Sequence, residues 1–227
     1  MNFTYYGHSC FLVETCGKKI LFDPFITKNE LAAHIEINNI EADYILISHG
    51  HFDHIADCVP LAETTQAKVV CNWEIYEWLN KQGLNKIHPM NTGGKWNFGE
   101  FTVKCTVAQH SGGLPDGSYG GNPMGFLIMS QEGNFYYAGD TALTMDMQSI
   151  PKWAKLNFAV LPIGDNFTMN ASDAAECAVM IECKTIIGVH YDTYVPLIKI
   201  DHEEAKQAFA AKGAELKLLK IGETISV

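Results

Sequence analysis

The sequence predicts an α/β protein in which two β-sheets pack against each other and helices cover their outer faces. Short runs rich in β-branched and aromatic residues fill the first third of the chain, as is typical of a meander of strands. Later in the chain, the apolar runs 157–163 and 184–189 enclose a segment of helical character. No Pro/Gly/Ser linker, charge block or repeat divides the 227 residues, so we expect residues 1–227 to form a single domain.

The N-terminal strands are expected at residues 3–6, 10–15 and 19–22, with a hairpin turn at Cys16-Gly17-Lys18. Residues 44–48 form a continuous apolar run, which predicts a strand that is buried on both faces. Further strands are expected at 68–71, 101–107, 125–130, 134–138, 157–163, 184–189, 215–221 and 224–227. The first half of the chain is therefore predicted to be a sheet with attached helices.

Capping signals predict where the helices begin and end. Helices are expected at 57–65, 74–80, 172–183 and between Asp201 and Lys212. Asp57 and Ser172 are the expected N-caps of the first and third of these helices. Asp201 and Glu204 have the spacing of a capping box, and Gly213 follows the last helix as a stop signal.

Charge and hydropathy exclude several classes of protein. The chain has 16 Lys and Arg against 26 Asp and Glu, so its formal net charge is −10. Phosphate contacts need clustered basic residues, and the longest basic run is Lys18-Lys19, so no nucleic-acid partner is expected. The N-terminus has no signal-peptide pattern, and apolar runs such as 44–47 are too short to span a bilayer. We expect a cytoplasmic protein without a membrane span, and the sequence leaves open whether it forms a homo-oligomer.

Cysteine usage agrees with a reducing compartment. The seven cysteines are odd in number, are spread along the chain and include no Cys-x-x-Cys pair. This pattern favours small buried thiols over a disulfide framework or a thiolate zinc site. With 47% hydrophobic and 19% charged residues, the composition is that of an ordinary globular protein.

The strongest functional signal is the run Ser48-His49-Gly50-His51-Phe52-Asp53-His54, which follows a predicted buried strand. If the run is extended, His49 and His51 share one face, and the turn into the next helix moves Asp53 and His54 to a neighbouring position. One loop can therefore serve two adjacent metal ions. Imidazole and carboxylate groups without a thiolate suit Zn²⁺, Mn²⁺, Fe or Ni²⁺. The alternative is a polar loop in which Asp53 caps the next helix.

Four ligands cannot complete two metal sites, and three further candidates follow predicted strands. His110 follows the strand 101–107, Asp140 follows 134–138, and His190 follows 184–189. Loops at the end of a sheet commonly carry catalytic groups on a rigid scaffold. Taken singly, each of these residues is as well explained by a turn or by a partly buried histidine. Their repeated placement after apolar strands favours a common site.

In these residues the sequence resembles the metallo-β-lactamase superfamily. The superfamily motif H-x-H-x-D-H is matched in full by residues 49–54, and its later His, Asp and His are matched in order by His110, Asp140 and His190. The resemblance covers most of the chain. It implies an αββα four-layer sandwich with a dinuclear metal site at one edge of the two sheets.

Three other segments are similar to one branch of that superfamily. They are Tyr6-Gly-His-Ser-Cys-Phe11, Phe22-Asp-Pro24 and Gly164-Asp-Asn-Phe-Thr-Met169. The branch comprises small metal-dependent hydrolases such as the ascorbate-phosphate lactonases and the N-acyl-phosphatidylethanolamine phospholipases. Its members cleave carbonyl as well as phosphoryl esters, so this similarity implies no single bond type.

The resemblance implies a role for each ligand. His49, His51 and His110 would hold one metal ion, Asp53, His54 and His190 the other, and Asp140 would bridge the two. Zn²⁺ is the first choice for both ions, with Mn²⁺, Fe or Ni²⁺ as alternatives. Two such ions lower the pKa of a shared water from 15.7 toward about 7, so a metal-bridging hydroxide is available as the nucleophile at neutral pH.

Other residues are expected to support this site. Asp23 and Asp165 lie in loops after apolar strands, and each is a candidate for fixing the tautomer of a ligating histidine. Asp165 and Thr168 are alternatively substrate contacts or residues that satisfy a loop backbone. His8 is expected to contact substrate or to protonate the leaving group, the alternative being a hydrogen-bonded turn residue. The Gly-rich segment 110–125 is expected to form a loop or lid over the site.

The sequence thus predicts a dinuclear metal-dependent hydrolase acting on a small-molecule substrate with an ester-like bond, either a lactone or other carboxylic ester or a phosphodiester. Asp53, His8 and Asp140 are the residues expected to take part in catalysis. Two alternatives are a diiron-type redox enzyme of the same fold and a metal-binding module without catalysis. The redox enzymes replace a motif histidine by Glu and append a flavin domain, whereas His51 is present and 227 residues leave no room for such a domain.

Overall fold

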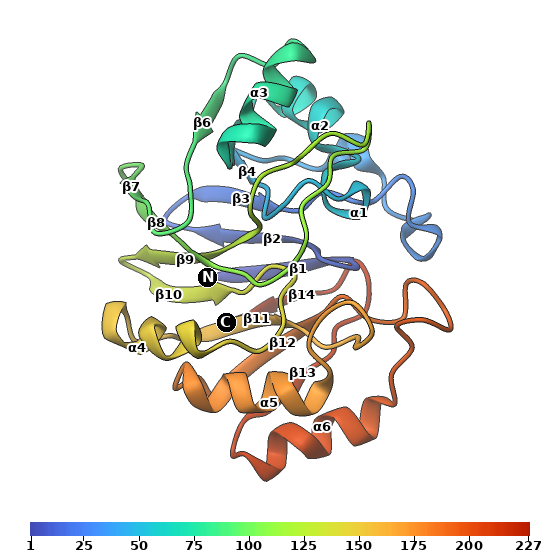
Figure 1. Cartoon of the computed structure of the whole chain (residues 1–227), viewed down its shortest axis with the longest axis vertical. Coiled ribbons are helices and arrows are strands. Elements are labelled where there is room, and N and C mark those ends of the chain that lie inside the picture. The colour runs from blue at the N-terminus through green and yellow to red at the C-terminus, as the bar shows by residue number, and fades with distance from the viewer.

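Two β-sheets pack face to face at the centre of the molecule, and helices cover both outer faces (Figure 1). The computed structural model describes residues 1–227. The outer face of the first sheet carries α2 (Cys58–Thr65) and α3 (Trp73–Lys81), and that of the second carries α5 (Ala171–Met180) and α6 (His202–Ala211). The predicted αββα four-layer sandwich is therefore confirmed. None of the helices combines the length and the apolar character needed to cross a membrane.

The first sheet has seven strands in the order β14-β1-β2-β3-β4-β5-β6. Their bounds are β1 (Asn2–Gly7), β2 (Cys10–Thr15), β3 (Lys18–Phe22), β4 (Tyr44–Leu46), β5 (Lys68–Cys71), β6 (Ile87–Pro89) and β14 (Thr224–Ser226). The pairs β1–β2 and β2–β3 are antiparallel, and β3 to β6 run parallel. Strands β1, β3 and β4 therefore point in the same direction.

The second sheet also has seven strands, in the order β13-β12-β11-β10-β9-β8-β7. Their bounds are β7 (Lys95–Asn97), β8 (Phe101–Val107), β9 (Met124–Ser130), β10 (Gly133–Tyr137), β11 (Phe158–Pro162), β12 (Thr185–Val189) and β13 (Glu215–Lys217). Strands β10 to β13 are parallel, and β8 and β10 are both antiparallel to β9. Strands β8, β10 and β12 therefore share one direction.

Buried apolar side chains hold the layers together. Aromatic residues dominate the interface between the sheets, where Phe11 stacks on Phe22 with ring centroids 4.5 Å apart, and Phe135 stacks on Phe158 at 4.8 Å. A second cluster joins the second sheet to α5 and α6, and a third joins the first sheet to α2 and α3. Burial of this apolar surface from water is the main force that fixes the two sheets against each other.

Short helices complete the chain, and of the two predicted N-caps Ser172 is wrong, whereas Asp57 has the predicted position without the capping bond. The remaining helical segments are α1 (Phe52–Ile55), α4 (Ile150–Trp153), η1 (Glu30–Ala32), η2 (Ile37–Asn39) and η3 (Met145–Ser149). Helix α5 is capped by Asn170, whose side chain accepts from the Asp173 N–H, and not by Ser172. Asp57 does precede α2, but its carboxylate accepts from the backbone N–H groups of Ile26 and Thr27. A longer-range contact has thus replaced the local cap.

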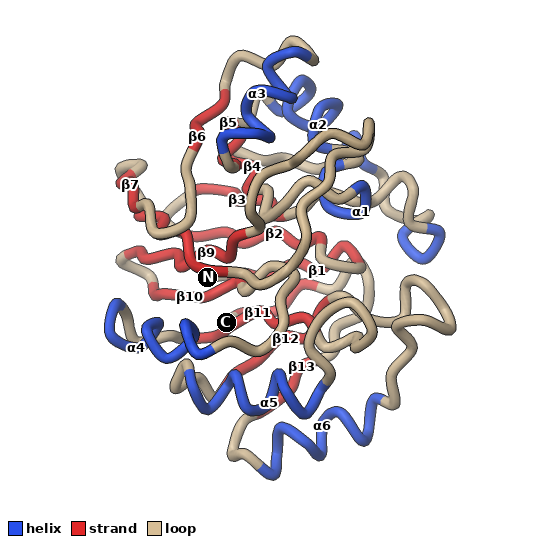
Figure 2. Tube along the Cα trace, viewed as in Figure 1, coloured by secondary structure: helices blue, strands red, loops and turns tan.

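Six strands end at the same side of the sandwich and deliver the candidate site residues there. The residues that follow them are His8 after β1, Asp23 after β3, His49 after β4, His110 after β8, Asp140 after β10 and His190 after β12. Much of the chain at this side is loop, drawn in tan in Figure 2. The direction of the strands therefore explains why residues so far apart in sequence can meet.

Candidate metal centre

The motif loop leaves β4 and turns at once into α1. His51 is the residue before the helix, and the N–H of His54 donates to its carbonyl oxygen over 3.0 Å. The carbonyl oxygen of Ser48 accepts from the Met124 N–H at 3.0 Å, which ties the start of the loop to the second sheet. His49 and His54 are buried, whereas Asp53 is half-buried and faces the rim of the site.

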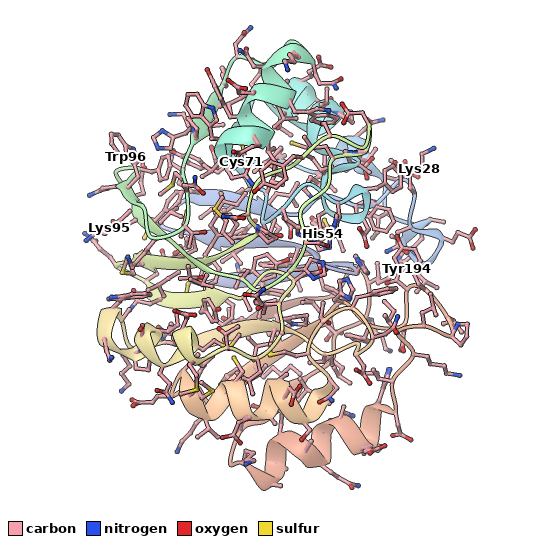
Figure 3. All side chains as sticks on the ribbon, in the orientation of Figure 1. Lys28, His54, Cys71, Lys95, Trp96 and Tyr194 are labelled. Carbon is pink, nitrogen blue, oxygen red and sulfur yellow. The ribbon has the colours of Figure 1, made fainter.

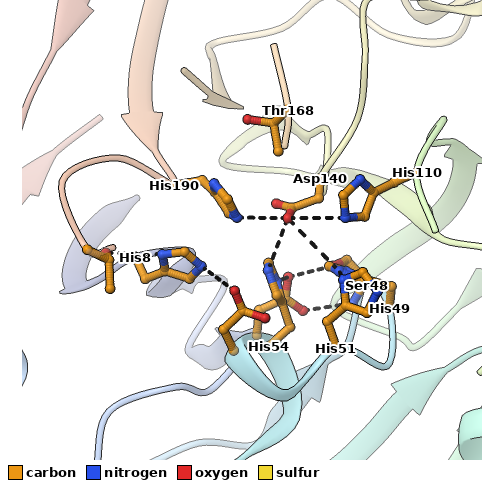
Figure 4. A network of polar contacts seen from close by, with 12 residues as sticks. His8, Ser48, His49, His51, His54, His110, Asp140, Thr168 and His190 are labelled. Atoms are coloured by element: carbon orange, nitrogen blue, oxygen red, sulfur yellow. Dashed lines mark hydrogen bonds and ion pairs between the residues drawn. The ribbon is translucent and has the colours of Figure 1, made fainter. Parts of the chain in front are cut away.

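Asp140 lies at the centre of the cluster, as Figure 4 shows. Its Oδ2 atom lies 2.9 Å from Nε2 of His190, 3.2 Å from that of His54, 3.7 Å from that of His110 and 4.0 Å from that of His49. A single carboxylate oxygen therefore faces imidazoles that come from both sheets.

The remaining ligand atoms fall into two groups around this carboxylate. In the first group, the ring nitrogens of His49, His51 and His110 lie within 4.8 Å of one another. In the second, ligand atoms of Asp53, His54, His190 and His8 meet the same criterion. These two groups contain the two sets of three that the resemblance implies, with His8 added to the second, and a third group of Asp23, His49 and His54 overlaps both.

The protonation of the first group suits metal binding. Burial, together with the charge of His54, lowers the pKa of His49 well below its usual value, and burial also lowers the pKa values of His51 and His110. All three rings are therefore neutral near pH 7, and neutral imidazole is the form that binds a metal ion.

Negative charge accumulates in the second group. Burial would raise the pKa of Asp140, but His190 and His54 hold it well below the usual value. Burial would likewise raise the pKa of Asp53, but the hydrogen bond from His8 and the charge of His54 lower it. Both carboxyl groups are thus ionised, and they would offset part of the charge of bound divalent cations.

Buried polar atoms without a protein partner also fit a metal centre. Oδ1 of Asp140 is buried and accepts no hydrogen bond, and Nε2 of His54 has only an ion-pair contact with Oδ2 of the same residue at 3.2 Å. Native proteins rarely leave such atoms unpaired. In addition, Nε2 of His49 lies only 2.9 Å from Nδ1 of His51. The imidazole and carboxylate donor set suits Zn²⁺ and similar divalent ions.

Asp23 orients two candidate ligands, His54 directly and His49 through the Ser48 hydroxyl. Its Oδ2 atom accepts from Nδ1–H of His54 at 2.8 Å and from the hydroxyl groups of Ser48 and Tyr137 at 2.6 Å each. Because the Ser48 hydroxyl donates to Asp23, it accepts from Nδ1–H of His49 at 3.0 Å. These bonds occupy Nδ1 of both histidines, so Nε2, the atom that faces Asp140, is the nitrogen that would bind a metal ion.

His8 is buried beside the second group, and its contacts favour a role in positioning. A carboxylate can only accept, so Nε2–H of His8 donates to Oδ2 of Asp53 at 3.1 Å, and Nδ1 then accepts from the Thr193 hydroxyl at 3.1 Å. Burial and the charges of His190 and His54 lower the pKa of His8 to about 4. The ring is therefore neutral near pH 7 and already occupied at both nitrogens.

Two other predicted residues lie outside the hydrogen-bonded cluster. Asp165 is exposed, and its side chain makes no hydrogen bond to any of the candidate ligands. Thr168 is half-buried near Asp140 in Figure 4, and its hydroxyl donates only to the carbonyl oxygen of Met169. The structure therefore brings Asp23, but not Asp165, into contact with a candidate ligand.

The Gly-rich loop expected over the site is anchored to α3 and the residue before it. The side-chain amide of Asn72 donates to the carbonyl oxygens of Gly120 and Asn122, and the Trp78 indole N–H donates to Asp116 at 2.8 Å. Ser111, at the start of this loop, lies 3.3 Å from Nε2 of His51 through its hydroxyl. The loop therefore contributes a direct contact to one candidate ligand.

Sequence reasoning missed the contribution of Ser48, Tyr137 and Thr193. Ser48 stands next to the motif, so its position after a buried strand was a usable signal. Tyr137 belongs to β10, where the continuous apolar run Phe135-Tyr-Tyr-Ala138 indicates core residues and gives no sign of the bond from its hydroxyl to Asp23. Thr193 reaches His8 across 185 positions, and no local pattern indicates that contact.

Left-handed backbone conformations mark the ends of the strands at the site. His8, Asp23 and His190 have φ angles of 53°, 41° and 57°. Such angles are uncommon for residues other than glycine and cost about 1–3 kcal/mol each. The backbone bond from the His190 N–H to the His8 carbonyl oxygen, at 2.9 Å, holds two of these residues in place.

The fold and the histidine-rich edge together define a metallo-β-lactamase-like protein. Residues 2–190 match the family model described as "Beta-lactamase superfamily domain", so the chain belongs to this family. The superfamily predicted from the motif is therefore confirmed.

Proteins that are similar to this chain over its full length define the class of enzyme more closely. The chain is 50% identical over 227 residues to a protein of Flavobacterium johnsoniae described as a UPF0173 metal-dependent hydrolase, with 100% of both chains covered. It is 48% identical to a protein of the same description from Methylacidiphilum infernorum, with 99% of each covered. Among solved structures, it is similar to Igni18, described as a novel metallo hydrolase from Ignicoccus hospitalis, with 32% identity, a TM-score of 0.86 and coverage of 99% and 97%. The predicted enzyme class, a metal-dependent hydrolase, is confirmed.

Proposed function

We propose that this chain is a dinuclear metal-dependent hydrolase that cleaves an ester-like bond in a small molecule, either a carboxylic ester such as a lactone or a phosphodiester. The observation that carries the proposal is the position of Asp140. Its Oδ2 atom lies within 4.0 Å of imidazole nitrogens from both groups of candidate ligands. A carboxylate in that position is suited to bridging two metal ions.

In this proposal, His49, His51 and His110 hold one ion, Asp53, His54 and His190 hold the other, and Asp140 contacts both. Zn²⁺ is the first candidate, with Mn²⁺, Fe and Ni²⁺ as alternatives. Two bound divalent ions would supply an acidified water as the nucleophile and a Lewis acid for the attacked oxygen.

The protein's own contribution is to fix these ligands in the correct tautomer and orientation. Asp23 accepts from Nδ1–H of His54, and Ser48 accepts from Nδ1–H of His49, so both rings present Nε2 toward Asp140 as the atom that would bind metal. His8 donates to Asp53 and restricts that carboxylate in the same way. Hydrogen-bond partners of this kind raise the basicity of the ligands. Their mutation typically lowers metal affinity or activity by about 10–100-fold.

Carbonyl and phosphoryl esters place similar demands on such a site. Both reactions develop negative charge on an oxygen of the substrate, and a metal ion can stabilise that charge without a protein donor. The arrangement of ligands is therefore suited to cleaving either kind of ester, and a turnover assay distinguishes the two.

The experiment is a turnover assay on purified protein loaded separately with Zn²⁺ and Mn²⁺. The substrates are a chromogenic phosphodiester, a lactone and a thioester, each measured before and after chelation. Cleavage of one class that chelator abolishes and metal restores supports the proposal and identifies the bond. The absence of metal-dependent turnover on all three, with metal bound, contradicts it. Asp146→Ala is a suitable control, because Asp146 is exposed and lies outside the ligand cluster.

A further inference from the structure

Large apolar side chains are exposed at the start of α1 and on the loop after His190, beside the candidate metal centre. Phe52 is 49% exposed and Tyr194 is 37% exposed, and Val195 and Leu197 in the same loop as Tyr194 are 62% and 57% exposed. Single exposed apolar residues are common on protein surfaces, but a group of them beside a polar site typically marks a binding surface.

The aromatic residues of this group are joined by a buried ring. Phe25 is buried and contacts Phe52 edge to face, with ring centroids 5.9 Å apart and an angle of 70° between the rings. On its other side, Phe25 lies 6.4 Å from the ring of Tyr194 at an angle of 36°. Phe25 therefore packs against both exposed rings and joins them into one aromatic cluster.

This surface is continuous with the candidate ligands. Phe52 is the first residue of α1 and stands between His51 and Asp53, so its exposed ring lies within the motif itself. The Tyr194 ring lies 5.5 Å from that of His8, edge to face, and His8 is hydrogen-bonded to Asp53. A molecule that reaches the metal centre would therefore meet these rings.

We propose that Phe52 and Tyr194, supported by the buried ring of Phe25, form an aromatic wall that binds an apolar group of the substrate, such as a phenyl or branched acyl group, next to the candidate metal centre. The inference rests on the proposed function, because it assigns the wall to the substrate of that same site. It names the substrate class as esters with an apolar group a few bonds from the cleaved bond.

A substrate group fits this surface better than a second copy of the chain does. A stable contact between copies buries about 800 Å² on each partner, which three rings and two aliphatic residues do not supply. The wall also borders ionised carboxylates, and the burial of such groups in a contact between proteins would cost free energy. A small molecule with one apolar group and one polar group at the metal centre meets neither difficulty.

The test compares the binding of butyrate and of 4-phenylbutyrate to the zinc-loaded protein by titration calorimetry. Both acids offer the same carboxylate to the metal centre, and only the second offers a ring to the wall. We expect 4-phenylbutyrate to bind about tenfold more tightly, since an aromatic contact of this kind adds to the area buried. Tyr194→Ala and Phe52→Ala are expected to reduce this ratio to about threefold or less.

Two further variants make the test specific. Tyr194→Phe keeps the ring, so it is expected to retain the wild-type ratio. Trp96→Ala removes a similarly exposed aromatic side chain from β7, which Figure 3 shows well apart from Tyr194, and it is also expected to retain the ratio. Thermal melting of each variant identifies any that fails to fold.

The outcomes separate the wall from the reaction. Equal affinities of the wild type for the two acids, or a ratio that survives both alanine variants, overturn the proposal. A third result also overturns the proposal, namely alanine variants that change their oligomeric mass but keep the affinity ratio. That result would assign the rings to a contact between two copies of the chain. Binding of neither acid to the zinc-loaded protein also overturns it. A failure of the proposed function has a different signature, namely the tenfold preference without metal-dependent turnover.

Discussion

At the scale of single residues, two carboxylate oxygens at this site each contact several side chains. Oδ2 of Asp140 faces four imidazole nitrogens, and Oδ2 of Asp23 accepts from His54, Ser48 and Tyr137. Each carboxylate therefore restrains several side chains at once. The loss of one of them should have effects well beyond a single contact, because the remaining groups would be buried without a partner.

Asp140→Ala removes the carboxylate that both metal ions are proposed to share. We expect the metal content of the purified variant to fall and kcat/KM to drop by more than about 100-fold, since even residues that only orient ligands cost up to that factor. Elemental analysis and the turnover assay measure the two quantities, with Asp146→Ala as the control. Full retention of metal and turnover would remove the bridging role from Asp140.

Asp23→Asn keeps the shape of the side chain but weakens the hydrogen bonds that Oδ2 accepts from His54, Ser48 and Tyr137. His54 would lose the group that fixes its tautomer, so we expect metal affinity to fall by roughly 10–100-fold. Competition with a chromogenic chelator measures this affinity. Asp43→Asn is a matched control, because Asp43 accepts only from the backbone N–H of Lys19 at the far end of β3. Equal affinities of the two variants would show that Asp23 is not needed for metal binding.

The contacts of His8 favour a positioning role over the catalytic role that the sequence predicts. The sequence suggested a group that touches substrate or protonates the leaving group, whereas the ring is buried and donates to Asp53. We therefore expect His8→Ala to weaken the binding of one metal ion by about tenfold or more as well as lower turnover. Calorimetric titration with Zn²⁺ checks this, and two unchanged affinities with lost turnover would favour the direct catalytic role instead.

At the scale of elements, the site depends on strand ends that are fixed by close backbone packing. Gly164 follows β11, and an added Cβ atom would lie 2.0 Å from the carbonyl oxygen of His190. Only glycine allows the two loops to approach this closely. The chain after β11 therefore supports the position of His190 without supplying a ligand itself.

Gly164→Ala is expected to lower the free energy of unfolding by about 3 kcal/mol, because the methyl group must displace the His190 backbone. Urea denaturation measures this loss. Gly113→Ala serves as the control, since no atom lies within 4 Å of the added Cβ at that position. The same stability for the two variants would contradict the packing described for Gly164.

The sequence predicts the strands better than the details of the helices. Strands β2, β5 and β8 have the predicted bounds, because runs of apolar and β-branched residues define them without reference to the rest of the fold. The segment 215–221 is a strand only over Glu215–Lys217. Short strands such as β6 and β7 were missed, since three residues carry too little pattern.

The same distinction applies to the site. The candidate ligands could be predicted because their spacing and their positions after strands are local features. Asp57 stands at the predicted N-cap position of α2, but its carboxylate accepts from the backbone of Ile26 and Thr27 and not from the helix, and the contact between His8 and Thr193 likewise joins residues far apart in the chain. Partners that are distant in sequence therefore require the structure.

At the scale of the whole molecule, the candidate centre joins the two sheets. His49 and His54 come from the chain after β4 in the first sheet, whereas Asp140 and His190 follow strands of the second. Metal ions held between these residues would add a link between the halves of the sandwich. Such ions bind the folded chain and not the unfolded one, so they should also stabilise the fold.

Removal of metal is therefore expected to lower the melting temperature. At a free metal concentration of about 100 times Kd, binding adds about 2.7 kcal/mol per site, which corresponds to a shift of roughly 5–10 °C for a chain of this size. Differential scanning calorimetry with and without chelator measures the shift. Asp140→Ala should show a smaller shift than the wild type, and an equal shift would place the stabilising metal elsewhere.

The most direct measurement is a crystal structure of the zinc-loaded protein with anomalous difference maps at the zinc edge. We expect two peaks, one in contact with His49, His51 and His110, the other in contact with Asp53, His54 and His190, and both within bonding distance of Asp140. A single peak, or peaks that do not touch Asp140, would contradict the dinuclear centre.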